Sequence, residues 1–288
     1  MAGGRRRAWR RTWRAVLRNR TALAGLVITL IVALGVSAGA ALAPYSPVDM
    51  DFANILAPPS WMHPLGTDSF GRDVLTRVLY GGRISLLISF TGVLIAAAAG
   101  TLAGMSSAYH GGITDAGLMR FSDLLFSFPS FVLALFLMVV LGFGVQNVIL
   151  AIALVYFPIF ARLARNTTLL VKEEPFVQAA RLMGQSSLRI LFREILPNIA
   201  APLVVQASIG IAFGIVIEAG LSFLGLGVQP PTPSLGVIMA DGREYFQRGP
   251  WVLTLTGLVI SIALLGLNLL GDGLRDLTDP RLRKRAEL

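Results

Sequence analysis

The chain has no cysteine, only two lysines and only two histidines, and each shortage excludes a class of protein. Without cysteine there is no disulfide framework, no thiolate nucleophile and no cysteine-ligated zinc or iron–sulfur centre. Neither Lys172 nor Lys284 follows a glycine, so the Gly-Lys-Ser/Thr loop that holds the phosphates of ATP is absent. The motifs of serine hydrolases and zinc peptidases are missing too. We therefore expect no enzymatic activity and no cofactor bound by this chain.

Charged residues are also scarce. They make up 14% of the 288 residues, against about a quarter in soluble domains, whereas 55% of the residues are hydrophobic. Such a chain has too few polar side chains to cover a surface that faces water, which indicates an integral membrane protein. A hydrocarbon core of about 30 Å requires about 20 apolar helical residues. Uncharged runs predict six spans: 21–43, 84–108, two short spans between Asp123 and Arg162 joined at 142–147, about 195–224 with its main part after Pro202, and 251–271.

Three prolines, Pro230, Pro231 and Pro233, interrupt the weakly charged segment 225–250. Proline removes a backbone donor and breaks a helix interior. This segment is therefore predicted to be a loop rather than a seventh span.

The basic residues predict the orientation of the spans. Six spans place both termini on one side, and with the N-terminus in the cytoplasm 20 of the 25 arginines and lysines lie on the cytoplasmic side. The net charge of +9 thus reflects membrane orientation, and no nucleic-acid partner is expected.

The N-terminal arginines and Ala41-Leu42-Ala43 also resemble a cleavable secretory signal. The apolar run of 23 residues, however, has the length of a span, whereas signal cores have about 7 to 15 residues. Before this run, Trp9, Trp13 and Leu17 recur every four residues among arginines, which predicts a helix lying in the lipid headgroups.

The cytoplasmic segment 172–197 predicts two short helices that meet at a glycine. Pro175 follows two glutamates, as is typical of a first helical turn. Phe176, Ala180 and Met183 are spaced to form one apolar face, and Gly184 ends the helix, where the turn needs a positive φ.

Ser187 is expected to cap the second short helix, which ends around Pro197. A connector between two spans needs only a few residues. An ordered hairpin of this length is therefore predicted to dock on another protein, with packing on its own chain as the alternative.

A stripe of residues spaced by four runs along the fifth predicted span. Its glycines predict close helix packing. An acid at membrane depth is costly unless it faces protein or water, so Glu218 either pairs structurally or lines a translocation path. The stripe comprises Gln206, Gly210, Gly214, Glu218 and Ser222, and Ala96, Gly100 and Gly104 repeat the small-residue spacing in the second span.

The predicted outer segment 44–83 is much longer than a connector. One interpretation is a loop followed by a short interfacial helix over Val74, Leu75, Val78 and Leu79. The other is a docking surface for an extracytoplasmic partner. No metal site is expected, because the second histidine of the chain is assigned to the other side of the membrane. The candidate docking residues are His63, Gly66, Asp68, Arg72 and Asp73.

The inner hairpin resembles the EAA loop of binding-protein-dependent ABC importers. In that pattern Glu-Ala-Ala is followed after three residues by Gly, and then, after a spacer, by Ile-x-Leu-Pro. Here Gln178-Ala179-Ala180, Gly184 and Leu196-Pro197 occupy those positions. Two positions depart from the pattern, since Gln178 replaces the glutamate and Glu194 stands at the isoleucine position.

Three further motifs narrow the resemblance to the C-type permease subunits of dipeptide and oligopeptide importers. They are His-Pro-Leu-Gly-Thr-Asp at 63–68 with Gly-Arg-Asp at 71–73, Gly-Leu-Ser-Phe-Leu-Gly-Leu-Gly at 220–227, and Gly-Asp-Gly-Leu-Arg-Asp at 271–276 with Asp-Pro-Arg at 279–281. Together the motifs cover most of the chain from residue 21 onward.

This resemblance implies an all-α integral membrane fold of the type I ABC importer (MetI-like) class, with six transmembrane helices and cytoplasmic termini. It implies a homologous second permease subunit, two cytoplasmic ATP-binding subunits that hold ATP and Mg²⁺, and an extracytoplasmic substrate-binding protein. The residues expected to couple to the ATPase are Pro175, Phe176, Gln178, Ala179, Ala180, Arg181 and Gly184.

The expected organisation is a cytoplasmic segment 1–20, a first span 21–43, an extracytoplasmic loop 44–83, a five-helix core 84–271 and a cytoplasmic tail 272–288. Relatives of this type carry di- or oligopeptides, nickel chelates, glutathione or oligosaccharides, and peptide is the expected substrate. The alternative class is an ion-coupled secondary transporter that uses Glu218.

Overall fold

The computed structural model describes residues 19–278, and within this range the only β interaction is an isolated bridge between Thr67 and Asp73. The predicted headgroup helix at 1–20 and the motif at 279–281 lie essentially outside the described residues. The helices are α2 (Arg20–Leu42), η1 (Phe52–Asn54), α3 (Val74–His110), α4 (Gly112–Phe126), α5 (Ser130–Leu141), α6 (Val145–Val171), α7 (Pro175–Leu182), α8 (Ser187–Ile190), η2 (Leu191–Ile195), α9 (Leu196–Phe223), α10 (Leu235–Glu244) and α11 (Pro250–Thr278).

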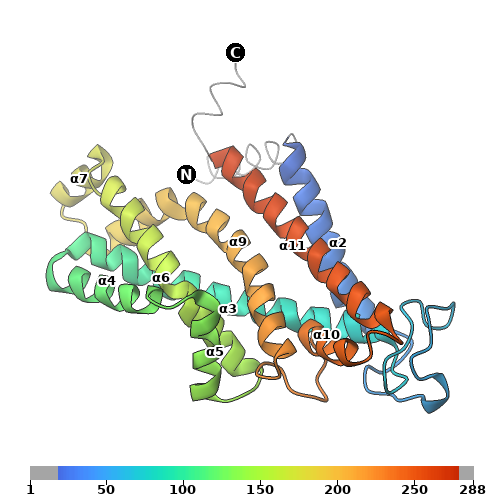
Figure 1. Cartoon of the computed structure of the whole chain (residues 1–288). Helices are drawn as coiled ribbons and strands as arrows, with labels where there is room; N and C mark the ends of the chain where they lie inside the picture. The colour runs from blue at the N-terminus through green and yellow to red at the C-terminus, as the bar shows by residue number, and fades with distance from the viewer. Residues whose placement is uncertain (1–18, 279–288) are drawn as a thin grey trace.

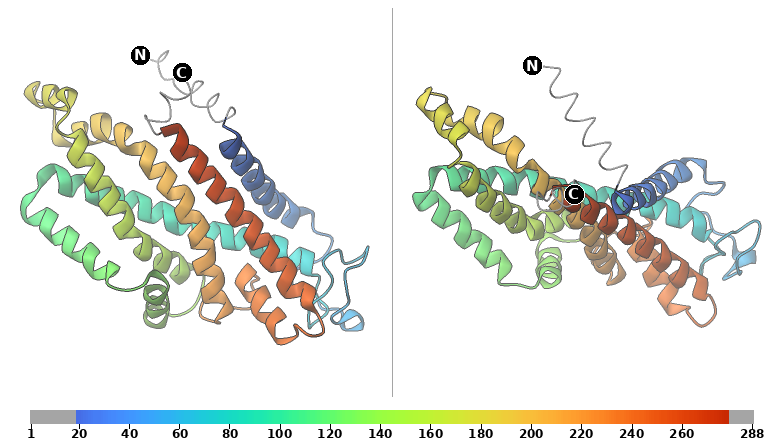
Figure 2. Two further views of the ribbon diagram at one scale, coloured as in Figure 1. Left: turned by 45° about the horizontal axis from the view of Figure 1, so that its top comes forward. Right: turned by 90° about the horizontal axis from the view of Figure 1, so that it is seen from above.

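The long helix α3 crosses the molecule, and the long helices α2, α6 and α9 pack against it (Figure 1). α6 and α9 lie along α3, while α2 and α11 pack side by side (Figure 2). The start of α2 and the end of α11 lie at one end of their pair. The loop between α2 and α3 and the α7 hairpin lie at opposite ends of α3, which we call the loop end and the hairpin end.

Five helices are long and apolar enough to cross a membrane: α2, α3, α6, α9 with its preceding turns, and α11. The third predicted span differs from expectation, because α5 has only 12 residues and meets α4 at a bend of 93°. Pro129 stands at this bend, and a proline disfavours helical backbone in the residue before it. Counting the bent pair as one span gives six. The predicted junction at 142–147 is confirmed, since α5 ends at Leu141 and α6 begins at Val145.

Two expectations about the loop end are wrong. The apolar stretch after Asp73 is not a separate interfacial helix. It forms the first turns of α3, which continues without interruption over 37 residues. Segment 225–250 is not all loop, because its three prolines precede α10, which Ser234 caps by accepting a hydrogen bond from the Val237 amide at 3.3 Å.

The second helix of the hairpin also differs from expectation, because it does not end at Pro197. The chain stays helical from Ser187 to Phe223, with a wide π turn at Leu191–Ile195 directly before that proline. A wide turn accommodates a residue that cannot continue the regular hydrogen-bond ladder. The main part of this helix does not begin after Pro202 as expected, since Pro202 lies inside α9, which begins at Leu196.

Glycines bring the backbones of α3 and α6 into contact. A Cβ atom on Gly104 would lie 2.1 Å from the Ala161 carbonyl oxygen, and one on Gly100 would lie 2.7 Å from that of Phe157. The small-residue stripe of the second predicted span is therefore confirmed as a packing face.

Gly104→Ala is expected to destabilise the protein by about 1–3 kcal/mol, because the added methyl group must push two backbones apart. Gly35→Ala is the matched control, since a Cβ on Gly35 of α2 meets nothing within 4 Å. Thermal unfolding of the detergent-solubilised variants measures the difference. Equal melting temperatures for the two variants would contradict this packing.

Candidate functional site

The hairpin glycine has the geometry that its sequence position predicts. Gly184 has φ +72°, the Gln185 amide donates to the Ala180 carbonyl at 3.1 Å, and the Gly184 amide donates to the Arg181 carbonyl at 3.0 Å. This pair of bonds is a Schellman motif, which ends a helix through one left-handed residue. Gly184 therefore fixes the angle at which α7 meets the following chain.

The two faces of α7 point in different directions. Val177 and Ala180 are buried, at 0% and 2% exposure, and belong to the main core of the chain. Phe176 and Met183 are 41% and 70% exposed. The predicted common face of Phe176, Ala180 and Met183 is therefore wrong, because Ala180 turns toward the chain's own core. The exposed residues of α7 and of the position that follows it are Pro175, Phe176, Gln178, Ala179, Arg181, Leu182 and Met183.

The predicted N-cap of the second short helix is also wrong. Ser187 is the first residue of α8, and Ser186 is its N-cap, without a side-chain capping bond. The helix is instead held by Ile190, Leu191 and Ile195, which are buried in the same core as Val177. The hairpin is thus seated on the rest of the chain by one apolar face and exposes the other.

Arg181, predicted to contact the ATPase, is exposed and also contacts its own chain. Its guanidinium sits 4.7 Å from the ring centroid of Tyr109, in the last turn of α3. Lys172, which follows α6, donates to the Ala108 carbonyl in the same turn at 3.0 Å. Sequence reasoning missed Tyr109 and Ala108, because no local pattern links them to residues more than 60 positions away.

The stripe on α9 is largely buried. Cβ atoms on Gly210 and Gly214 would lie 3.2 Å from Val93 and Ser89 of α3, so these glycines form a packing face. Gln206, at the hairpin end of the stripe, is only half-buried.

Glu218 is 0% exposed and lies where α3, α9 and α10 converge. The Ser222 hydroxyl donates to its Oε1 atom at 2.8 Å, and Ser222 Oγ in turn accepts from the Val228 amide at 3.1 Å. The Ser85 and Ser234 hydroxyls lie beside the same carboxyl group, and Ser85 accepts from the Leu235 amide at 3.2 Å. Glu218 therefore orders hydroxyl groups that hold the segment leading into α10.

The candidate docking residues of the outer loop turn inward. His63 Nδ1 donates to Asp73 Oδ1 at 2.9 Å, and the other oxygen of Asp73 accepts from the Thr76 amide at 2.7 Å and caps α3. His63, Gly66, Asp68 and Asp73 are buried. Among the described residues, no group of three or more His, Asp and Glu side chains could hold a metal ion.

Asp68 belongs to a ring of four charged side chains, which we call the ion-pair ring: Asp68, Arg72, Arg77 and Asp241. Arg72 donates to Asp68 at 2.7 Å and to Asp241 at 3.1 Å. Arg77 pairs with Asp68 and donates to Asp241 at 3.0 Å. The ring fastens the loop to the start of α3 and to α10. The sequence indicated neither Arg77 nor Asp241, because the pairing joins residues 164 positions apart.

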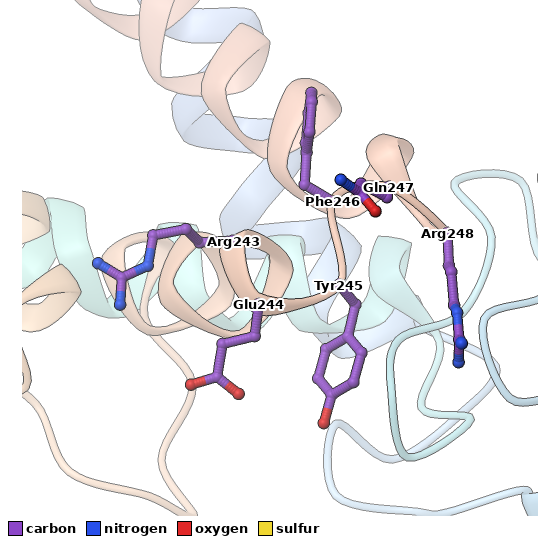
Figure 3. Close-up of a pocket in the computed structure, with 6 residues that line it drawn as sticks. All are labelled: Arg243, Glu244, Tyr245, Phe246, Gln247 and Arg248. Carbon is purple, nitrogen blue, oxygen red and sulfur yellow. The ribbon is translucent and has the colours of Figure 1, made fainter.

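The loop that carries Asp68 and Arg72 also has exposed apolar side chains. Trp61 is fully exposed, and Met62 and Phe52 are largely exposed. The turn after α10 adds a shallow hollow of about 620 Å³, lined by six consecutive residues. Arg243 and Arg248 lie on opposite sides of it, with Tyr245 between them (Figure 3). The Trp251 indole donates to the Thr67 carbonyl at 3.1 Å and joins the first turn of α11 to the loop.

Comparison with known proteins identifies the family. Residues 100–284 match the model of the binding-protein-dependent transport system inner membrane component, and residues 7–59 match the N-terminal TM domain of oligopeptide transport permease C. The di/tripeptide transport system permease protein of Pseudomonas aeruginosa is 39% identical over 280 residues, which cover 95% of this chain and 92% of that protein. The dipeptide transport system permease protein of Haemophilus influenzae is 40% identical, with 94% of each chain covered.

Two further matches extend the comparison. The glutathione transport system permease protein of Pectobacterium atrosepticum is 41% identical, over 96% of this chain and 93% of that protein. A chain of the inward-facing MetNI methionine ABC transporter shares the fold, with a TM-score of 0.54 and 22% identity over 70% of this chain and 96% of that one. The motif resemblance is confirmed: the chain belongs to the binding-protein-dependent transport system inner membrane components and is a multi-pass permease of the bacterial inner membrane.

Proposed function

We propose that this permease translocates di- or oligopeptides inward and that ATP is hydrolysed by separate subunits. The observation that carries the proposal is the exposed apolar side of α7 at the hairpin end, in a chain that has no phosphate loop of its own. Two relatives named for dipeptide or di/tripeptide transport, each similar over nearly the whole chain, support a peptide substrate. Glutathione, itself a small peptide, is the second candidate, supported by the glutathione transport relative.

The proposed topology counts the bent pair α4–α5 as one of six spans and places both termini in the cytoplasm. The excess of arginine and lysine in the segments predicted to be cytoplasmic supports this orientation. The loop end then faces outward. The proposed assembly contains a homologous second permease subunit, two ATP-binding subunits and an extracytoplasmic substrate-binding protein.

Coupling to the ATPase is assigned to the exposed side of α7. Phe176 and Met183 present apolar surface, and Ala179 between them is small enough to let the helix approach closely. Ala180 and Val177 seat the helix on this chain instead. A bulky residue at Ala180 is thus expected to act by displacing α7 from its own core.

Docking of the binding protein is assigned to the exposed residues around the ion-pair ring rather than to the buried residues of the loop. Trp61 stands fully exposed on a loop that the ring and Trp251 hold rigid. Rigid, exposed tryptophan and arginine side chains are typical centres of protein interfaces. Trp61 and the turn 243–248 are therefore proposed to meet the binding protein.

The geometry of Gly184 predicts a graded mutant series. Gly184→Pro and Gly184→Val are expected to abolish or strongly lower uptake, because proline fixes φ near −65° and a left-handed β-branched residue costs at least about 1–2 kcal/mol. Gly184→Asn is expected to retain uptake, because asparagine tolerates this conformation. Membrane insertion, measured by immunoblot of washed membranes, serves as the control. Normal uptake by Gly184→Pro would contradict the assignment of the hairpin to coupling.

Trp61→Ala is expected to weaken binding of the cognate substrate-binding protein by about thirtyfold, the effect of losing one central interface residue. Titration of the binding protein against the permease in nanodiscs measures this affinity. Ile113→Ala, which removes an equally exposed apolar side chain at the hairpin end, should leave it unchanged. An unchanged affinity for Trp61→Ala would place the docking surface elsewhere.

Transport itself is tested by reconstituting the permease pair with its ATP-binding subunits in proteoliposomes. Uptake of a labelled dipeptide is expected only with the binding protein outside and ATP inside. A protonophore should leave this uptake unaffected. Uptake that continues without ATP and stops with the protonophore would instead support an ion-coupled transporter. Uptake of glutathione but not of dipeptides would revise the substrate alone.

A further inference from the structure

The last turn of α3 is held by two cations from the hairpin side of the chain. Lys172 Nζ donates to the Ala108 carbonyl at 3.0 Å, and the Arg181 guanidinium lies 4.7 Å from the Tyr109 ring centroid. The last carbonyls of a helix have no partners within it and carry partial negative charge, so cations are favoured there. A guanidinium over an aromatic face is attracted by the ring as well.

Arg181 belongs to α7 and Lys172 directly precedes it, so the two cations bracket the helix proposed to contact the ATPase. The backbone of α7 packs on α8 and η2, and its buried side chains Val177 and Ala180 lie in the main core. Arg181 extends from α7 to the end of α3. A displacement of α7 therefore acts on α3 through Arg181.

The opposite end of α3 is held by ion pairs. Arg77, in the first turns of α3, is buried and pairs with Asp68 of the loop and with Asp241 of α10. Between Arg77 and Tyr109 the helix is unbroken, and its 37 residues span about 55 Å. One rigid element thus joins the α7 hairpin to the ion-pair ring and α10 at the other end of the molecule (Figure 1).

We propose that Arg181 and Tyr109, supported by Lys172, form a clamp by which α7 moves α3, so that Arg181 is a positioning residue within this chain rather than a contact of the ATPase. The inference rests on the proposed function, in which ATP-driven movement of partner subunits reaches this chain at α7. The clamp passes that movement to α3, and α3 carries it to the ion-pair ring.

A double-mutant cycle in the reconstituted transporter tests the clamp. The variants are Arg181→Gln, Tyr109→Leu and the double substitution. Tyr109→Phe is a conservative control because it keeps the aromatic face. Arg120→Gln is a charge control, because it removes one exposed arginine from α4. For each variant we would measure assembly with the ATP-binding subunits, ATP hydrolysis, dipeptide uptake and thermal stability.

Arg181→Gln and Tyr109→Leu are each expected to assemble and hydrolyse ATP while peptide uptake per ATP falls at least about fivefold. The double variant should be no worse than Arg181→Gln, because both changes remove the same contact. Tyr109→Phe and Arg120→Gln should transport normally. Lys172→Gln should lower the same ratio and Lys172→Arg should restore it, since a guanidinium can also donate to the Ala108 carbonyl.

Three results would overturn the clamp. The first is normal uptake by Tyr109→Leu. The second is a double variant whose loss is the product of the single losses, which would mean that the two residues act separately. The third is loss of assembly by Arg181→Gln but not by Tyr109→Leu, which would place Arg181 in the ATPase interface. Failure of the unaltered chain to assemble with ATP-binding subunits would instead contradict the proposed function.

Discussion

The rest of the structure depends on the packing of α3 against its neighbours. In lipid, helices gain no hydrophobic stabilisation from leaving water, so they associate through close packing and through satisfied polar groups. Gly100 and Gly104 let α6 approach until backbones touch, and Gly210 and Gly214 let α9 pack on side chains of α3. Because α3 is unbroken over 37 residues, these contacts fix one rigid element to which both ends of the molecule are attached.

Two clusters of buried polar side chains join segments that are distant in the sequence. The ion-pair ring joins the loop, α3 and α10, and the Glu218 cluster joins α3, α9 and the segment before α10. Removing one partner of a buried charge pair leaves an uncompensated charge, which is strongly destabilising. These two clusters therefore fix the position of α10 relative to α3 and α9.

The α7 hairpin has one face buried against its own chain and one exposed face, and the two faces have different roles in the proposed function. The seated face makes the hairpin part of this subunit, and the exposed face is free for a partner. A helix attached only by apolar burial could slide, whereas the Gly184 motif and the cations at the end of α3 fix its angle and position. Under the proposed function, a movement imposed on α7 would then be transmitted into the spanning helices.

The sequence alone was sufficient for properties that depend on local composition. Uncharged runs located the long spans, Gly184 indicated a left-handed turn, and the missing phosphate loop excluded ATP hydrolysis by that route, because each of these follows from neighbouring residues. The tertiary structure alone decided which way side chains face and what they meet. Ala180 turned inward, Asp68 paired with arginines and Asp73 with His63, and Glu218 met serines from other helices. Those outcomes depend on contacts between residues up to 169 positions apart, which no local pattern encodes.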